Sequence, residues 1–246
     1  MPMHDWTRID PNDYHDFHLS WIAALKSALN NGRLPPGYFA LAEHTLRPFV
    51  PDVVTLSVPD TSPGGANEPG GVAVAAAPGP MITATALGRG KTVGRRRVTI
   101  QHARSRHIVA VIEIVSPGNK AKKSQFIDLV GKSVDFLRHG VHVLLIDPFP
   151  PTSRDPNGIH AVVWKRLTGE TFTPPDGKPL TLASYVARGA NTFSTFVEPL
   201  AVGDLLRDMP LFLTDELHIL TPLEETYQVA WQGFPSFLRA IVTPPP

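Results

Sequence analysis

His107-Ile-Val-Ala-Val-Ile-Glu-Ile-Val115 decides the fold, because it reads as a β-strand with apolar residues at both alternating positions. Such a strand is covered on both faces of a sheet, so we expect it to be central. One acid, Glu113, lies inside it. An ionised carboxylate there is costly unless a cation compensates it, and a metal ion or a lysine at the end of the strand is the usual compensation.

The residues that follow predict a second, parallel strand. Ser116-Pro-Gly-Asn119 is typical of a turn, and the stretch from about Lys122 to Arg138 has the apolar stripe of a helix that ends at Gly140. Val141 to Asp147 is again apolar. Because strand, helix, strand connections are right-handed crossovers, we expect the two strands to be parallel neighbours with the helix on one face.

The rest of the chain predicts an α/β fold with a mixed central sheet and flanking helices. Asn12 and Asp13 are expected to cap the first helix, and residues 59–80, rich in Gly, Pro and Ala, predict a mobile loop. We expect one domain over 1–246, with a core at about 11–150 and a β-rich C-terminal extension at 151–246. The further expected elements are helices over 11–31, 223–231 and 234–242 and strands over 38–46, 51–58, 95–103, 161–165, 182–187 and 192–200.

Composition excludes several classes of protein. The 246 residues, 42% of them hydrophobic, can bury one large core. The chain has no cysteine, which excludes disulfides, thiolate zinc sites and cysteine nucleophiles; a metal would need oxygen or imidazole ligands, and an oxygen-rich site suits magnesium or manganese. No apolar run is long enough to cross a bilayer, and the N-terminus has no signal pattern, so we expect a soluble cytoplasmic protein without a membrane partner.

The net charge of +1 conceals a basic region. Between Arg89 and His139 there are twelve Lys or Arg residues against three Asp or Glu residues. Clustered positive charge favours a polyanionic partner such as nucleic acid, although a charge run is also typical of a solvated face. The candidate phosphate contacts are Arg95, Arg96, Arg97, Lys122 and Lys123.

The order of the elements resembles the core of the PD-(D/E)XK nuclease superfamily: a helix, strands, Asp52 at a strand start, Glu113 in the next buried strand, a helix and a strand. This resemblance implies that Asp52 and Glu113 ligate Mg or Mn, while a lysine steadies the attacking water. Glu43, on the strand before Asp52, is either a further metal ligand or a solvent-facing residue. The superfamily's lysine usually lies two residues after the acid, where this chain has Val115. Lys120 from the turn and Lys132 from the helix are the candidate replacements.

A closer resemblance, over most of the chain, is to the domain of unknown function 4058 family. A weaker one is to a restriction endonuclease-like family, whose spacing Lys132, Phe136 and Gly140-Val141 match. The segments that carry the closer resemblance are Leu34-Pro-Pro-Gly-Tyr38, Pro51-Asp-Val-Val54, Ile112-Glu-Ile-Val-Ser-Pro-Gly-Asn-Lys120, Gly140-Val-His-Val-Leu-Leu-Ile-Asp147, Asp208-Met-Pro-Leu-Phe-Leu213 and Pro222-Leu-Glu-Glu-Thr-Tyr227.

Three functions follow as alternatives. The first is metal-dependent phosphodiester hydrolysis of nucleic acid, favoured by Asp52, Glu113 and the basic region. The second is a catalytically inert, nuclease-like binding or regulatory module, favoured by Val115 in place of the lysine. The third is a structural or assembly protein, suggested by the 26 prolines and an aromatic C-terminal segment. DNA and RNA, and a monomer and a homodimer, all stay open.

Overall fold

The computed structural model describes residues 3–43, 82–87 and 97–243, and for Glu43 and residues 83–87 it describes the backbone. The strands are β1 (Tyr38–Glu43), β2 (Ile82–Leu87), β3 (Arg97–His102), β4 (Ile108–Ile114), β5 (His142–Asp147), β6 (Leu180–Ala187), β7 (Thr192–Leu200), β8 (Met209–Phe212) and β9 (His218–Thr221). The helices are α1 (Pro11–Ala28), α2 (Pro117–Ala121), α3 (Lys123–Arg138), α4 (Gly158–Thr168), α5 (Leu223–Gly233) and α6 (Ser236–Val242), with a 3-10 turn η1 (Trp6–Arg8) and a π-helical turn η2 (Leu29–Arg33).

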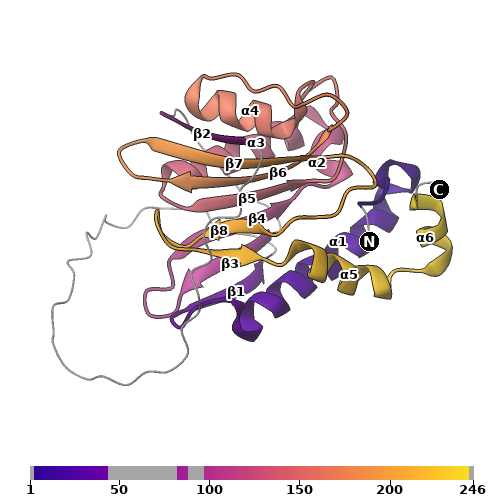
Figure 1. Cartoon of the computed structure of the whole chain (residues 1–246), viewed down its shortest axis with the longest axis horizontal. Coiled ribbons are helices and arrows are strands. Elements are labelled where there is room, and N and C mark those ends of the chain that lie inside the picture. The colour runs from indigo at the N-terminus through magenta and orange to yellow at the C-terminus, as the bar shows by residue number, and fades with distance from the viewer. Residues whose placement is uncertain (1–2, 44–81, 88–96, 244–246) are drawn as a thin grey trace.

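The fold is mixed α/β, as predicted, and its centre is a seven-stranded sheet in the order β1-β3-β4-β5-β6-β7-β2 (Figure 1). β4 and β5 are parallel, while the other neighbouring pairs are antiparallel. The central position of β4 and its parallel pairing with β5 confirm the expected crossover. Because β6 and β7 extend the same sheet, the C-terminal part of the chain is continuous with the part before it.

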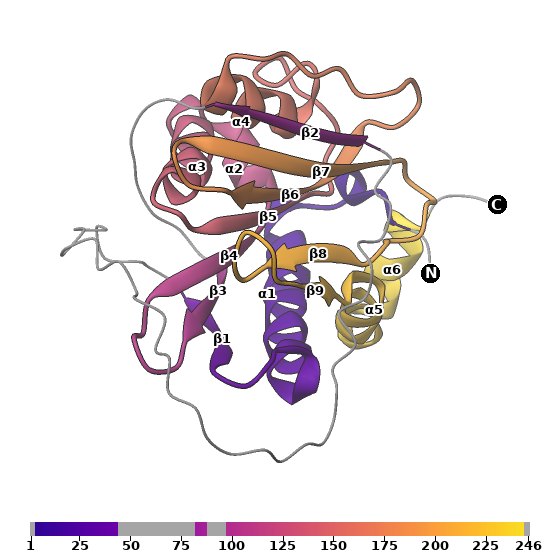
Figure 2. The same ribbon diagram turned by 60° about the vertical axis from the view of Figure 1, so that its left-hand side comes forward.

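Helices cover both faces of the sheet. α1, α5 and the hairpin of β8 and β9 lie on one side, and α3 and α4 lie on the other (Figure 2). The alternation of β4 matches these layers, because Ile112 and Ile114 pack in the α1 core while Val111 and Val115 pack in the α3 core. Glu113 has the parity of Val111 and Val115, so it belongs to the face that α3 covers.

α1 begins one residue earlier than its predicted cap. The side chain of Asp10 accepts the backbone N–H of Asn12 at 2.8 Å, and Pro11 occupies the first helical position. Asp10 is therefore the N-cap, in place of the predicted Asn12 and Asp13, because proline at that position needs no N–H acceptor. The helix predicted over 11–31 ends in the π-helical turn η2, in which Gly32 has a φ of 98°.

One predicted strand is wrong. Residues 161–165 lie inside α4, whose buried residues include Ile159, Val163, Trp164 and Leu167 at helical spacing. A short apolar run fits a buried strand and a buried helix equally well, and packing against α3 and β6 decides for the helix. The predicted strands over 182–187 and 192–200 and the helices over 223–231 and 234–242 are confirmed by β6, β7, α5 and α6. The predicted strand over 51–58 and the loop over 59–80 lie outside the described residues.

None of the helices in the described ranges has the length and the apolar content needed to cross a membrane.

Candidate functional site

Glu113 is buried, with 5% of its surface exposed, in the layer between the sheet and α3. Its Oε2 lies 3.5 Å from Nε of Arg97, and both side chains are buried. Arg97 is the first residue of β3, and the register that pairs Val98 with Ile112 brings Arg97 beside Glu113. A distance of 3.5 Å is a close ion pair but long for a hydrogen bond. An arginine of the neighbouring strand therefore compensates the charge of Glu113, whereas the sequence predicted a metal ion or a lysine in this role.

Lys132 lies on the helix that covers this pair. The guanidinium carbon of Arg97 lies 4.7 Å from the ring centre of Phe136, and Lys132 is one helical turn before Phe136 on the same face of α3. Lys132 is 5% exposed. We call Arg97, Glu113 and Lys132 the α3-face cluster. Lysine, arginine and glutamate are seldom buried this deeply, so the α3-face cluster marks this layer as a candidate site.

Lys120 belongs to a different cluster. Its ammonium lies 2.7 Å from Oδ2 of Asp147 and 2.9 Å from Oδ2 of Asp155, and all three side chains are at most 5% exposed. The ammonium also donates to the backbone carbonyls of Phe149 and Pro150, at 3.0 and 3.2 Å. We call Lys120, Asp147 and Asp155 the Lys120 cluster. Four oxygens therefore surround one ammonium.

The local sequence explains this position of Lys120. Ser116 and Asn119 form a capping box at the start of α2, with the Ser116 backbone N–H donating to Oδ1 of Asn119 at 2.8 Å. The short helix carries Lys120 to the edge of the sheet where β4 and β5 both end, next to Asp147 as the last residue of β5. The expected turn at 116–119 is thus the first turn of a helix, and it points Lys120 to Asp147 and Asp155 while Glu113 is paired with Arg97.

The two carboxylates of the Lys120 cluster have different surroundings. The pKa of Asp147 is raised to about 6, chiefly by burial and also by neighbouring Asp155, while the charge and hydrogen bond of Lys120 and the backbone N–H of Phe149 oppose the increase. Asp155 accepts hydrogen bonds from the backbone N–H of Thr152, at 2.8 Å, and from the hydroxyl of Thr152.

Because the ammonium of Lys120 is held by four oxygens, it is not placed to steady a water at Glu113. Lys132 is the stronger of the two predicted lysine candidates.

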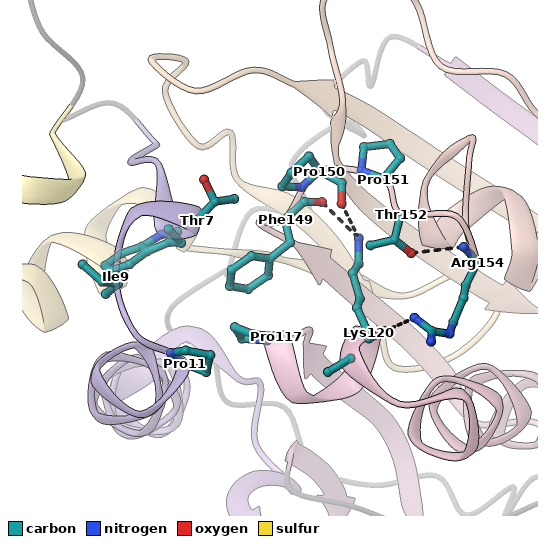
Figure 3. Close-up of a pocket in the computed structure, with 12 residues that line it drawn as sticks. Thr7, Ile9, Pro11, Pro117, Lys120, Phe149, Pro150, Pro151, Thr152 and Arg154 are labelled. Carbon is teal, nitrogen blue, oxygen red and sulfur yellow. Dashed lines mark hydrogen bonds between the residues drawn. The ribbon is translucent and has the colours of Figure 1, made fainter.

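A pocket of about 450 Å³ adjoins the Lys120 cluster (Figure 3). Three separate stretches of chain line it, with residues drawn from 6–11, 117–121 and 149–154. Its position at the ends of β4 and β5 separates it from the α3-face cluster, which lies between the sheet and the helix. Of the predicted site residues whose side chains the structure describes, Lys120 alone lines this pocket.

The remaining predicted residues are only partly described. Asp52, Arg95 and Arg96 lie outside the described residues, and of Glu43 the structure describes the backbone, opposite Arg97 in register. Lys122 and Lys123 are exposed at the start of α3, as a phosphate contact requires. The prediction that Arg97 contacts phosphate is wrong. Arg97 is 1% exposed and ion-paired, so its side chain does not belong to the surface of Lys122 and Lys123.

Within residues 3–43, 82–87 and 97–243, no group of three His, Asp or Glu side chains is arranged to hold a metal ion. Glu113 is one carboxylate beside a guanidinium, whereas magnesium sites use one or two carboxylates together with further oxygens. The described donors therefore do not make a metal site by themselves. The predicted set of Asp52, Glu113 and Glu43 stays a prediction.

Sequence reasoning missed Asp147 and Asp155. For Asp147 a signal exists, because the carboxyl ends of two parallel strands meet at one edge of a sheet, which places Asp147 near the segment that follows Val115. For Asp155 there is no such signal, since it reaches Lys120 from a loop.

Comparison with models of known protein families, with curated proteins and with solved structures found no match to this chain.

Proposed function

We propose that the chain is a nuclease-like module that hydrolyses phosphodiesters and that the α3-face cluster carries the reaction. The observation that supports this proposal is the burial of Arg97, Glu113 and Lys132 in the layer between the central strands and α3. Keeping several charges in such a layer costs free energy, so their burial there calls for a reason, which the proposed reaction supplies.

Each residue of the cluster has a distinct role in this proposal. Glu113 accepts a proton from the attacking water as the water oxygen bonds to phosphorus, the P–O bond to the leaving oxygen breaks, and Glu113 returns the proton to that oxygen. Lys132 and Arg97 stabilise the negative charge on the phosphoryl oxygens as it redistributes in the transition state. Outside the layer, Lys122 and Lys123 contribute phosphate contacts that position the substrate without reading its sequence.

A divalent ion would supply further charge stabilisation and a more acidic bound water. Glu113 is the carboxylate that this cluster would offer to the ion, and Asp52 is the predicted second ligand. Because the described donors do not suffice for magnesium or manganese, the roles above concern side chains of the chain alone.

The test is cleavage of labelled single-stranded and duplex DNA and RNA in buffers with Mg²⁺ or Mn²⁺. Glu113→Gln keeps the shape of the side chain and removes its basicity, so the proposal expects a loss of roughly 100-fold or more in rate. Asp128→Asn is the matched control, since Asp128 is an exposed acid on the same helix. Equal rates for the wild-type chain and Glu113→Gln would reject the proposal.

A second candidate is a catalytically inert, nuclease-like module that binds nucleic acid. The ion pair of Arg97 and Glu113 favours it, because the guanidinium already neutralises the carboxylate and both groups are under a tenth exposed. In that case oligonucleotide binding weakens steeply with salt and depends on Lys122 and Lys123. Binding without cleavage, unchanged in Glu113→Gln, distinguishes this candidate from the first.

A further inference from the structure

The pocket beside the Lys120 cluster takes no part in the proposed hydrolysis. Its volume of about 450 Å³ lies within the range of small-molecule sites. The residues that line it come from the segment that runs from η1 to the first residue of α1, from α2 and from the loop after β5. Such a meeting of three distant segments gives a concave site whose shape depends on the whole fold.

The walls of the pocket are apolar and rigid. Trp6 packs against Phe17 with ring centres 4.2 Å apart, and Phe149 meets the ring of Tyr14 edge-on at 4.8 Å. Four prolines line the same space, and a proline ring fixes its own backbone angle. The four prolines are Pro11, Pro117, Pro150 and Pro151. Because these walls are held in place without a ligand, binding requires little ordering of the protein.

Two cations line the pocket, and their situations differ. The ammonium of Lys120 is surrounded by four oxygens and is 4% exposed. Arg154 is exposed, and its Nη1 donates to the backbone carbonyl of Lys120 at 3.0 Å. A guanidinium carries five N–H donors in a planar fork, so this bond uses one of them. In Figure 3 Arg154 lies on the opposite side of Lys120 from Ile9 and Phe149.

We propose that this pocket binds a small organic anion with an apolar body and one carboxylate. The body packs against the accessible apolar residues Ile9, Pro11 and Pro117, and the carboxylate accepts hydrogen bonds from the guanidinium of Arg154. One planar fork matches one carboxylate, a geometry that arginine favours. A doubly charged phosphate would bring extra negative charge toward Asp147 and Asp155. These two carboxylates already share one cation, the ammonium of Lys120, so they would repel it. A single carboxylate therefore fits the charge of the site better.

The test compares two probes of the same shape, naphthalene-2-carboxylate and naphthalene-2-methanol, by isothermal titration calorimetry on the full chain. The wild-type chain is expected to bind the carboxylate roughly 10-fold to 100-fold more tightly than the alcohol, the range for hydrogen bonds to a charged group. Arg154→Gln is expected to abolish this preference. Arg8→Gln removes an exposed arginine that does not line the pocket, so it is expected to keep the preference.

A second variant tests the position of the body. Ala121 is exposed and lines the pocket, so Ala121→Phe is expected to fill the space and weaken both probes. Three results would overturn the proposal: no binding of the carboxylate at millimolar concentration, equal affinity of the two probes for the wild-type chain, or an unchanged preference in Arg154→Gln. Probe binding that is unaffected by Ala121→Phe would also overturn it, because the probe would then lie elsewhere.

Discussion

The Lys120 cluster and the α3-face cluster both bury opposite charges, yet they are built differently. In the first, four oxygens lie 2.7 to 3.2 Å from one ammonium. In the second, the ion pair of Arg97 and Glu113 is 3.5 Å long, and Arg97 also lies over an aromatic ring. Short hydrogen bonds from one ammonium to several oxygens offset part of the cost of burying these charges. We infer that the Lys120 cluster stabilises the fold, while the proposed function assigns the reaction to the α3-face cluster.

The largest expected effect is on the Lys120 cluster. Lys120→Met removes the common partner of Asp147 and Asp155, and breaking a buried ion pair costs about 3–5 kcal/mol. Urea unfolding measures this loss. Lys123→Met is the matched control, since Lys123 is exposed and such surface changes alter stability by about 0.5 kcal/mol or less. If both variants unfold at the same urea concentration, the Lys120 cluster has no stabilising role.

The pH dependence of stability sharpens the comparison. The pKa of Asp147, about 6 in the folded protein, lies above the ordinary value near 3.9. Between these values the folded chain binds more protons than the unfolded chain, so the contribution of Asp147 to stability falls as pH rises. We expect the free energy of unfolding of the wild-type chain, relative to Asp147→Asn, to decrease by roughly 2–3 kcal/mol between pH 3.5 and pH 7. A difference that is constant or increases with pH would contradict the burial of an Asp147 carboxyl group with this pKa.

Double-mutant cycles give a smaller, direct measure of the difference between the clusters. The cycle of Lys120→Met with Asp147→Asn should give a coupling energy of about 2–3 kcal/mol, in keeping with a 2.7 Å contact. The cycle of Arg97→Gln with Glu113→Gln should give about 1 kcal/mol, because that contact is 3.5 Å long. A larger coupling between Arg97 and Glu113 than between Lys120 and Asp147 would reverse the assignment of the two clusters.

The central crossover could be predicted from the sequence because each of its elements carries a strong signal. β4 and β5 are continuous apolar runs, and α3 has an apolar stripe that ends before Gly140. The prediction of a strand over 161–165 was wrong because a run of five apolar or amphipathic residues is too short for its periodicity to distinguish a strand from a helix. The choice came from packing against α3 and β6, which lies outside the local sequence.

The candidate site could be predicted less fully. The sequence showed that Glu113 needs a partner, since it is a carboxylate in an otherwise apolar strand. Its partner was not, because three consecutive arginines look alike as a basic run, and only the register of β3 turns Arg97 inward. Lys120 and Lys132 were equally suitable candidates in the sequence. The residues around Lys120 do not indicate that Asp155, in the loop after β5, lies next to it.

The most direct test of the central claim is the cleavage rate of Lys132→Gln, measured at a temperature where urea unfolding shows that both it and the wild-type chain are folded. The proposed function expects the rate constant for phosphodiester hydrolysis to fall by roughly 100-fold or more, because a cation that stabilises the transition state is lost. The free energy of unfolding should change less than in Lys120→Met. A Lys132→Gln variant that cleaves at the wild-type rate would contradict the claim that the α3-face cluster carries the reaction.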